Sequence, residues 1–379
     1  MPFTEGENKT IAYIRNQYQA LGLKPGNGES YFQEVPMVEL ETNNMSDLLI
    51  TNGKDALTLN FINVFVALTR RVTEHIEITN CELVFAGFGI VAPEYNWNDY
   101  EGIDVKGKTV LVLVNDPGFS TKNTNLFKGE EMTYYGRWTY KYEEAARHGT
   151  AGIIIVHDTK PASYPWSVVA HGWTGANLYL QAEDNNMSRS HFEGWVSLES
   201  ANTIFALAGM ADNDFTKEAI TQDFKSFSLN LNLSLSFDNA QKLSKSNNVV
   251  GLLPGTTHTD EVIIYSGHWD HLGVGDPIDG DSIFNGAIDN AFGIASILEI
   301  ARIYGQQNEA PKRSVLFLAV TAEEQGLLGS EYYASHPLFA PKKSVANINI
   351  DALSAYGSMK DLTLVGVRYY HLAGFLRFP

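Results

Sequence analysis

Cysteine and basic residues are both scarce in this sequence. One cysteine, Cys81, occurs among 379 residues, which excludes an internal disulfide and any cysteine-rich zinc or iron–sulfur site. Lysine and arginine together number 27 against 44 aspartate and glutamate residues, for a formal net charge of −17. Because an acidic surface repels phosphate backbones and anionic lipid headgroups, we expect no nucleic-acid partner and no membrane partner.

Long hydrophobic runs are missing as well. Runs such as Ser314–Ala319 and Ala151–Val156 fall far short of the roughly 20 residues that a membrane-spanning helix needs. Residues 1–7 show neither the basic nor the apolar region of a signal peptide. Core material is ample, since 44% of residues are hydrophobic and only 19% are charged. The sequence therefore predicts a soluble globular protein of two or three domains, at roughly 150 residues per domain.

The spacing of apolar residues predicts the secondary structure. Apolar residues three or four positions apart predict helices at residues 7–22, 140–148, 290–305 and 326–335. Short β-branched runs and strict alternation predict strands at residues 151–156, 315–320 and 225–237. From residue 248 onward strands and helices alternate, so the predicted fold class is α/β, with helices on the faces of a sheet.

The stretch from residue 81 to residue 215 has a different character. Strand-like runs end in glycine turns, and long loops rich in Gly, Ser and Asn lie between them. Its polar residues do not cluster as a catalytic site would. We therefore predict an inserted, mainly β domain at 81–215, within a discontinuous domain formed by residues 1–80 and 216–379.

Four groups of possible metal ligands follow predicted strands or open a helix in the last third of the chain. They are His268 with Asp270, then Asp289, then Glu323 with Glu324, and finally Asp351. In open α/β sheets, sites form at the carboxyl ends of the strands, so these groups could converge. Imidazole and carboxylate donors without thiolate suit zinc, and also manganese or cobalt.

Each group also has an ordinary structural interpretation. His268 and Asp270 could form a hydrogen-bonded turn, and Asp289 could cap the helix that follows it. Glu323 and Glu324 could stabilise a helix start through its dipole. Asp351 at the end of an apolar strand is harder to explain, because a buried unpaired carboxylate is costly. The occurrence of all four groups in order favours a metal site.

Four segments of the sequence resemble the M28 family of co-catalytic zinc peptidases. They are residues 266–273, 285–293, 321–330 and 349–351, and residues 248–255 are similar to the family's entry into its catalytic sheet. The resemblance covers about residues 248–354 and implies a mixed-sheet zinc-exopeptidase domain. Residues 81–215 resemble the protease-associated (PA) domain that many members carry as an insertion, through residues 87–89, 105–110 and 144–152.

The resemblance also implies a role for each residue. His268 and Asp351 would bind a first zinc ion, Asp289 would bridge two ions, and Glu324 would bind the second. Glu323 would be the general base of a hydrolysis carried out by a hydroxide that bridges the two metals. Asp270 would accept the other ring N–H of His268 through its carboxylate. The implied activity is that of an aminopeptidase, which releases N-terminal residues from a peptide substrate.

Beyond Asp351 the sequence departs from the family pattern. Family members have a further histidine there as a ligand of the second metal, and the only later histidine of this chain is His371. We therefore expect a C-terminally incomplete chain, derived from an exported parent protein, periplasmic or secreted. Two alternatives stay open. One is a carboxypeptidase or a glutaminyl cyclase on the same scaffold, and the other is an inactive remnant that binds metal or peptide. His271 is expected to play a structural role or to support a neighbouring metal ligand.

Overall fold

The computed structural model describes residues 1–211, 215–278 and 280–352, so His371 and its surroundings lie outside the described residues. The chain divides into two compact units. The first unit joins residues 1–33 to the chain from residue 247 onward, and the second contains residues 34–246. The predicted boundaries at 81 and 215 lie inside the second unit, and the assignment of a separate inserted domain there stays a prediction.

A mixed sheet forms the centre of the first unit. Its strands are ordered β18 (Ser344–Asn349), β14 (His258–His268), β17 (Arg313–Val320), the end of β13 (Phe227–Leu253) and β1 (Lys24–Pro25). The first three strands are parallel to one another, whereas β13 runs antiparallel to β17 and to β1. The predicted α/β class with a mixed sheet is confirmed.

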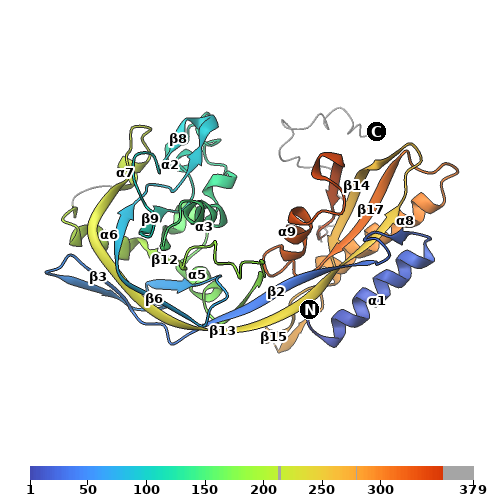
Figure 1. Ribbon diagram of the computed structural model, residues 1–379, viewed down its shortest axis with the longest axis horizontal. Helices are drawn as coiled ribbons and strands as arrows, with labels where there is room; N and C mark the ends of the chain where they lie inside the picture. The colour runs from blue at the N-terminus through green and yellow to red at the C-terminus, as the bar shows by residue number, and fades with distance from the viewer. Residues whose placement is uncertain (212–214, 279, 353–379) are drawn as a thin grey trace. The chain divides into compact units, whose positions relative to one another are not determined.

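Helices cover both faces of this sheet. On one face α1 (Glu5–Ala20) and α8 (Phe292–Gly305) pack on one side of β17 through Ile14, Ile297 and Phe317 (Figure 1). On the other face α9 (Leu328–Ser335) packs through Tyr333 on the alternate residues of β17, including Leu318. Because both faces of β17 are buried, most of its sequence is a continuous run of apolar residues.

The predicted helices of this unit are present, with shifted ends. Helix α1 starts two residues earlier than predicted, where the Thr4 side chain accepts a hydrogen bond from the backbone N–H of Glu7. Helix α8 starts two residues later because Asn290 has a non-helical backbone. Helix α9 also starts two residues later, because Leu327 has a left-handed conformation with φ of 65°.

The second unit is built around four parallel strands in the order β6 (His75–Phe85), β9 (Thr109–Leu113), β10 (Gly152–His157) and β12 (Phe192–Ser197). Strand β5 (Phe65–Leu68) pairs antiparallel with β12, and residues 227–238 of β13 pair antiparallel with β6. The alternating burial of β13 confirms the strand predicted at 225–237. The helix predicted at 140–148 is α3 (Trp138–Arg147).

The remaining elements are short or lie at the edges of the two units. In the second unit they are β2 (Phe32–Asn43), which starts at the end of the first unit, β3 (Leu48–Thr51), β4 (Ala56–Leu59), β7 (Val91–Ala92), β8 (Trp97–Asn98), β11 (Ala176–Leu180), α2 (Pro117–Thr121), α4 (Thr159–Ala162), α5 (Trp166–Gly172), α6 (Leu198–Leu207), α7 (Phe215–Ala219), η1 (Pro93–Tyr95) and η2 (Tyr134–Gly136). In the first unit they are β15 (Gly273–Ile278), β16 (Asp281–Phe284), η3 (Ala287–Ala291) and η4 (Pro341–Lys343). The segment predicted to be mainly β thus carries helices as well as strands.

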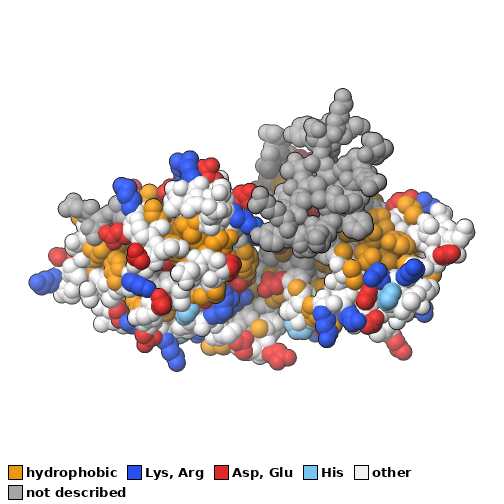
Figure 2. Space-filling model, turned by 90° about the horizontal axis from the view of Figure 1, so that it is seen from above, with side chains coloured by type: hydrophobic (Ala, Val, Ile, Leu, Met, Phe, Trp, Pro, Cys, Tyr) orange, Lys and Arg blue, Asp and Glu red, His pale blue; other side chains and the backbone are white. Residues whose placement is uncertain are grey.

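Charged side chains of both signs are mixed on the surface. On the face shown in Figure 2, the Lys and Arg side chains of the described residues are scattered among Asp and Glu side chains in each unit. Among the described helices, none has both the length and the apolar character that crossing a membrane requires.

Ile297 offers a test of the packing between α8 and the sheet. Its side chain is fully buried, and Ile297→Ala should lower the free energy of unfolding by roughly 2–5 kcal/mol through lost burial and a residual cavity. Ile303 lies on the same helix with 45% of its surface exposed, and Ile303→Ala should cost below about 1 kcal/mol. Urea unfolding followed by circular dichroism measures both. Equal losses in the two variants would contradict this packing.

Candidate metal centre

The candidate site lies at the carboxyl ends of three parallel strands of the first unit. His268 is the last residue of β14 and pairs in register with Val320, the last residue of β17. Ser266 of β14 pairs with Asn349, the last residue of β18. This register places the turn with Glu323 and Glu324, and the residue Asp351, at the same sheet edge as His268. Asp289 reaches this edge from η3, which precedes α8.

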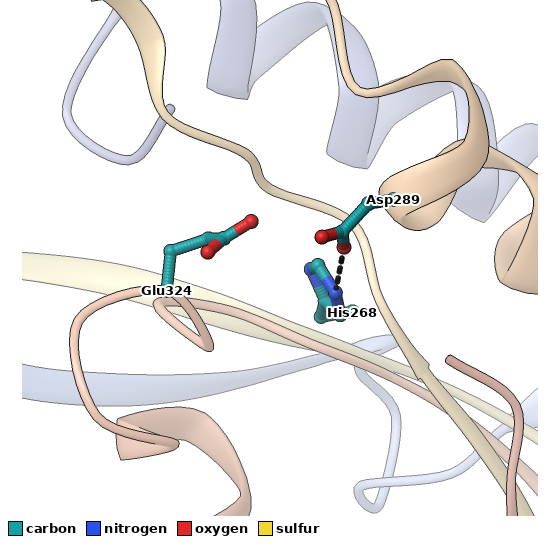
Figure 3. Close-up of side chains that lie close together, drawn as sticks. All are labelled: His268, Asp289 and Glu324. Carbon is teal, nitrogen blue, oxygen red and sulfur yellow. Dashed lines mark ion pairs between the residues drawn. The ribbon is translucent and has the colours of Figure 1, made fainter. Parts of the chain in front are cut away.

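The structure brings the predicted metal ligands together. The Nε2 atom of His268 lies 3.0 Å from Oδ1 of Asp289 and 3.2 Å from Oδ1 of Asp351. Donor atoms of His268, Asp289 and Glu324 lie within 4.8 Å of one another, and so do donor atoms of His268, Glu323 and Asp351. Figure 3 shows Asp289 and Glu324 on opposite sides of one space above the His268 ring.

A backbone carbonyl group fixes the orientation of the His268 ring. Its Nδ1 lies 2.8 Å from the carbonyl oxygen of Asp270, and because a carbonyl only accepts, Nδ1–H is the donor. Nε2 is therefore the ring atom that faces the carboxylates. The carboxylate of Asp270 is 4.0 Å from Nδ1 and accepts instead from the backbone N–H of Glu323 at 3.3 Å. The predicted role of the Asp270 carboxylate is thus taken by its carbonyl, while the side chain holds the Glu323 turn.

The ordinary structural interpretations do not account for Asp289, Glu323 and Glu324. Asn290, rather than Asp289, accepts a hydrogen bond from the first turn of α8, at Gly293 N, and its amide donates to the carbonyl of Ile350. Asp289 is left half-exposed with its carboxylate on His268. Glu323 and Glu324 precede the start of α9 at Leu328, so they do not lie in its first turn.

Burial, together with hydrogen bonds and neighbouring charges, changes the acidity of the site. Burial raises the pKa of Asp270 to about 6, although the backbone N–H of Glu323 and the charge of His268 oppose the shift. Burial also raises the pKa of Glu323, opposed by His268 and reinforced by the charge of Asp351. Burial alone would lower the pKa of His268, but the hydrogen bond to Asp270 and the surrounding carboxylates raise it.

These residues fit a zinc ion. The carboxylates of Asp289, Glu323 and Asp351 lie within 3.8 Å of a single imidazole nitrogen, an excess of negative charge that a cation would neutralise. Nitrogen and oxygen donors without thiolate are among the ligand sets that zinc takes in catalytic sites. A cavity of about 450 Å³ adjoins His268, Glu323 and Asp351, with Leu318 and Tyr333 in its walls.

One contact at the site was not anticipated from the sequence. The Nδ1 atom of His271 lies 2.5 Å from Oε1 of Glu324, and about four fifths of each side chain is buried. Its position directly after Asp270 was the only indication in the sequence that His271 lies near the site. The separation of 53 residues along the chain gave no indication of its partner.

The segment that contains the candidate site is similar to a known family. Residues 248–371 match Peptidase family M28. Aminopeptidase NAALADL1 from Mus musculus is 33% identical over 314 residues, which cover 71% of this chain and 38% of the relative. A probable zinc metalloprotease from Pyrenophora teres f. teres is 38% identical over 103 residues, covering 27% of this chain and 22% of the relative. The chain thus spans less than two fifths of the length of these relatives.

A solved structure shows a more distant likeness. The aminopeptidase from Aneurinibacillus sp. strain AM-1 has a TM-score of 0.43 and 18% sequence identity, over 92% of this chain and 65% of that one.

Zinc should stabilise this chain through the candidate site. At a free zinc concentration about 100 times the Kd, one bound ion adds about 2.7 kcal/mol to the free energy of unfolding. We expect this gain in the native sequence and a much smaller gain in Asp289→Asn, measured by thermal unfolding and by metal analysis. Asp281→Asn, the same change at an exposed position on β16, is the matched control. Less than about one zinc per chain, unchanged by Asp289→Asn, would contradict the site.

Proposed function

We propose that this chain is a zinc-dependent aminopeptidase, which hydrolyses N-terminal residues from peptides. The observation that carries the proposal is the convergence of four carboxylates on His268, those of Asp289, Glu323, Glu324 and Asp351. All five lie within the segment that matches Peptidase family M28.

The proposed site would hold two zinc ions, the second of them without the further histidine that the family supplies, which does not lie among the described residues. His268 and Asp351 would hold the first ion, because Nε2 and Oδ1 of these residues are 3.2 Å apart and face each other at the sheet edge. Glu324 would hold the second ion. Asp289 would bridge the two, since its Oδ1 lies on His268 and its carboxylate lies within 4.8 Å of a donor of Glu324. A carboxylate has two oxygens, so Asp289 can serve both ions.

Bound zinc would supply Lewis acidity, which lowers the pKa of water and polarises a carbonyl group. The chain itself must then supply a base. Glu323 is suited to this task because its side chain points to the same space as Nε2 of His268, at 3.8 Å. It would take the proton of the attacking water and deliver it to the leaving amine. Asp270 steadies this base through the backbone N–H of Glu323.

Charge favours substrates with a free amino terminus. Five carboxylates, from Asp270, Asp289, Glu323, Glu324 and Asp351, surround one imidazole. Two zinc ions would balance four of these five negative charges, and the remaining charge would attract the ammonium group of an N-terminal residue. The relatives named as aminopeptidases support the same reading. A panel of aminoacyl, carboxyl-terminal and N-terminal glutamine substrates separates this function from a carboxypeptidase and from a glutaminyl cyclase.

The proposal extends to the second unit. We propose that its residues 81–215 form the PA-like insertion that the sequence resembles, placed between the two parts of a catalytic domain. Its parallel core of β6, β9, β10 and β12 would then be the scaffold of that insertion.

Glu323 is the residue whose change tests the proposed chemistry. In Glu323→Gln the amide cannot take a proton, so kcat should fall by roughly 100-fold or more, the size expected for a general base. Zinc content should stay near that of the native sequence, because Glu323 is proposed as a base and not as a ligand. Steady-state kinetics and metal analysis of the same samples measure the two effects.

Glu331→Gln is the matched control, since Glu331 is exposed on α9 outside the site. It should leave both kcat and zinc content unchanged. An unchanged kcat in Glu323→Gln would refute its role as base, and a loss of zinc with kcat would make it a ligand instead.

A further inference from the structure

His271 touches both of the chain segments proposed to hold the second zinc ion. On one side its Nδ1 lies 2.5 Å from Oε1 of Glu324. An ionised carboxylate only accepts hydrogen bonds, so Nδ1–H is the donor and the bond is assisted by charge. The two side chains are only 21% and 19% exposed, which limits the competition from water.

On its other side His271 packs against the loop that carries Asp289. A Cβ atom placed on Gly286 would lie 2.8 Å from Cβ of His271 and 2.9 Å from Cγ, closer than real side chains come. The same atom would lie 2.8 Å from the carbonyl oxygen of Asp289. Gly286 has a φ of 63° and accepts a hydrogen bond from the backbone N–H of Ala291. Cβ and Cγ of His271, where the ring begins, therefore pack directly against the backbone of the turn that presents Asp289.

These contacts fix the distance between Glu324 and the Asp289 turn, and binding of the second ion depends on that distance. Glu324 has several rotatable bonds, and ordering them costs free energy each time the ion binds. A donor that already holds the carboxylate lowers that cost, and such supporting hydrogen bonds typically change metal affinity by about 10–100-fold. The turn that presents Asp289 packs against the other side of His271. His271 therefore also fixes the distance between this turn and Glu324.

We propose that His271 is a positioning residue for the second zinc ion: its Nδ1–H orients Glu324, and its ring sets the distance between Glu324 and the Asp289 turn. The proposal rests on the proposed two-metal function. His271 acts here through Glu324 and does not bind the metal. Within the described residues, its ring is not a member of either group of donor atoms that lie within 4.8 Å of one another.

Cobalt binding tests the proposal without an activity measurement. The metal-free chain is titrated with Co²⁺, whose visible absorption reports each filled site, and zinc competition gives the affinities. The native sequence should bind two ions. His271→Ala should bind the first with native affinity and the second about 10–100 times more weakly.

Two further variants separate the hydrogen bond from the packing of the ring. His271→Asn keeps an N–H at the position of Nδ1 and should recover most of the second affinity. His271→Phe keeps a ring against Gly286 but has no donor, so its second site should stay weak. Leu272→Ala, a change at the exposed neighbouring residue, is the control and should bind both ions as the native sequence does.

Each outcome decides between the proposals. A native second affinity in His271→Ala or in His271→Phe would overturn the positioning role and leave the proposed function intact. Equal weakening in His271→Asn and His271→Ala would overturn the role of the hydrogen bond. A native chain that binds no metal would overturn the proposed function, and the positioning role with it. Thermal unfolding of the metal-free variants tests whether each of them is folded. If His271→Phe is not folded, the comparison of His271→Asn with His271→Ala decides.

Discussion

The register of the parallel pairs β14–β17 and β14–β18 is the constraint on which the candidate site depends. It places His268 opposite Val320 and Ser266 opposite Asn349, so three chain segments leave the sheet at one edge. Side chains alternate between the faces of a strand, and a slip of one residue would turn His268 to the opposite face. The apolar clusters on both faces of β17 oppose such a slip, because it would exchange the residues that each face buries. The core thus fixes the geometry of polar groups that contribute little to it.

Electrostatic repulsion acts against that geometry. Asp289, Glu323 and Asp351 lie within 3.8 Å of one imidazole nitrogen, and nearby like charges destabilise one another. The fold holds them in place through neutral contacts: the Asp270 carbonyl on His268, and Asn290 on both Ile350 and Gly293. A divalent cation would convert this repulsion into attraction. Residues that carry no charge therefore support the site as much as its charged members do.

Much of this could be predicted from the sequence, and the limits have physical causes. The α/β class and the helices followed from apolar spacing, and the meeting of His268, Asp289, Glu324 and Asp351 followed from strand ends that share an edge. The starts of α8 and α9 could not be predicted in this way, because they depend on backbone conformations at Asn290 and Leu327. The contact of His271 with Glu324 could not be predicted, since it joins two loops whose approach is set only by the folded sheet.

The second unit shows that strand ends alone do not make such a site. The parallel strands β9 and β10 also end at a cavity, of about 250 Å³, lined by Asn115 and Asp116. There the polar side chains form hydrogen bonds with neighbouring residues of the same unit: Asn115 donates to the carbonyl of Pro161, and Asp116 accepts from Gly118 and Thr133. The first unit differs in that carboxylates at its sheet edge face one another across a shared space. The proposed metal site thus depends on carboxylates that converge on one imidazole, and the sheet determines where they meet.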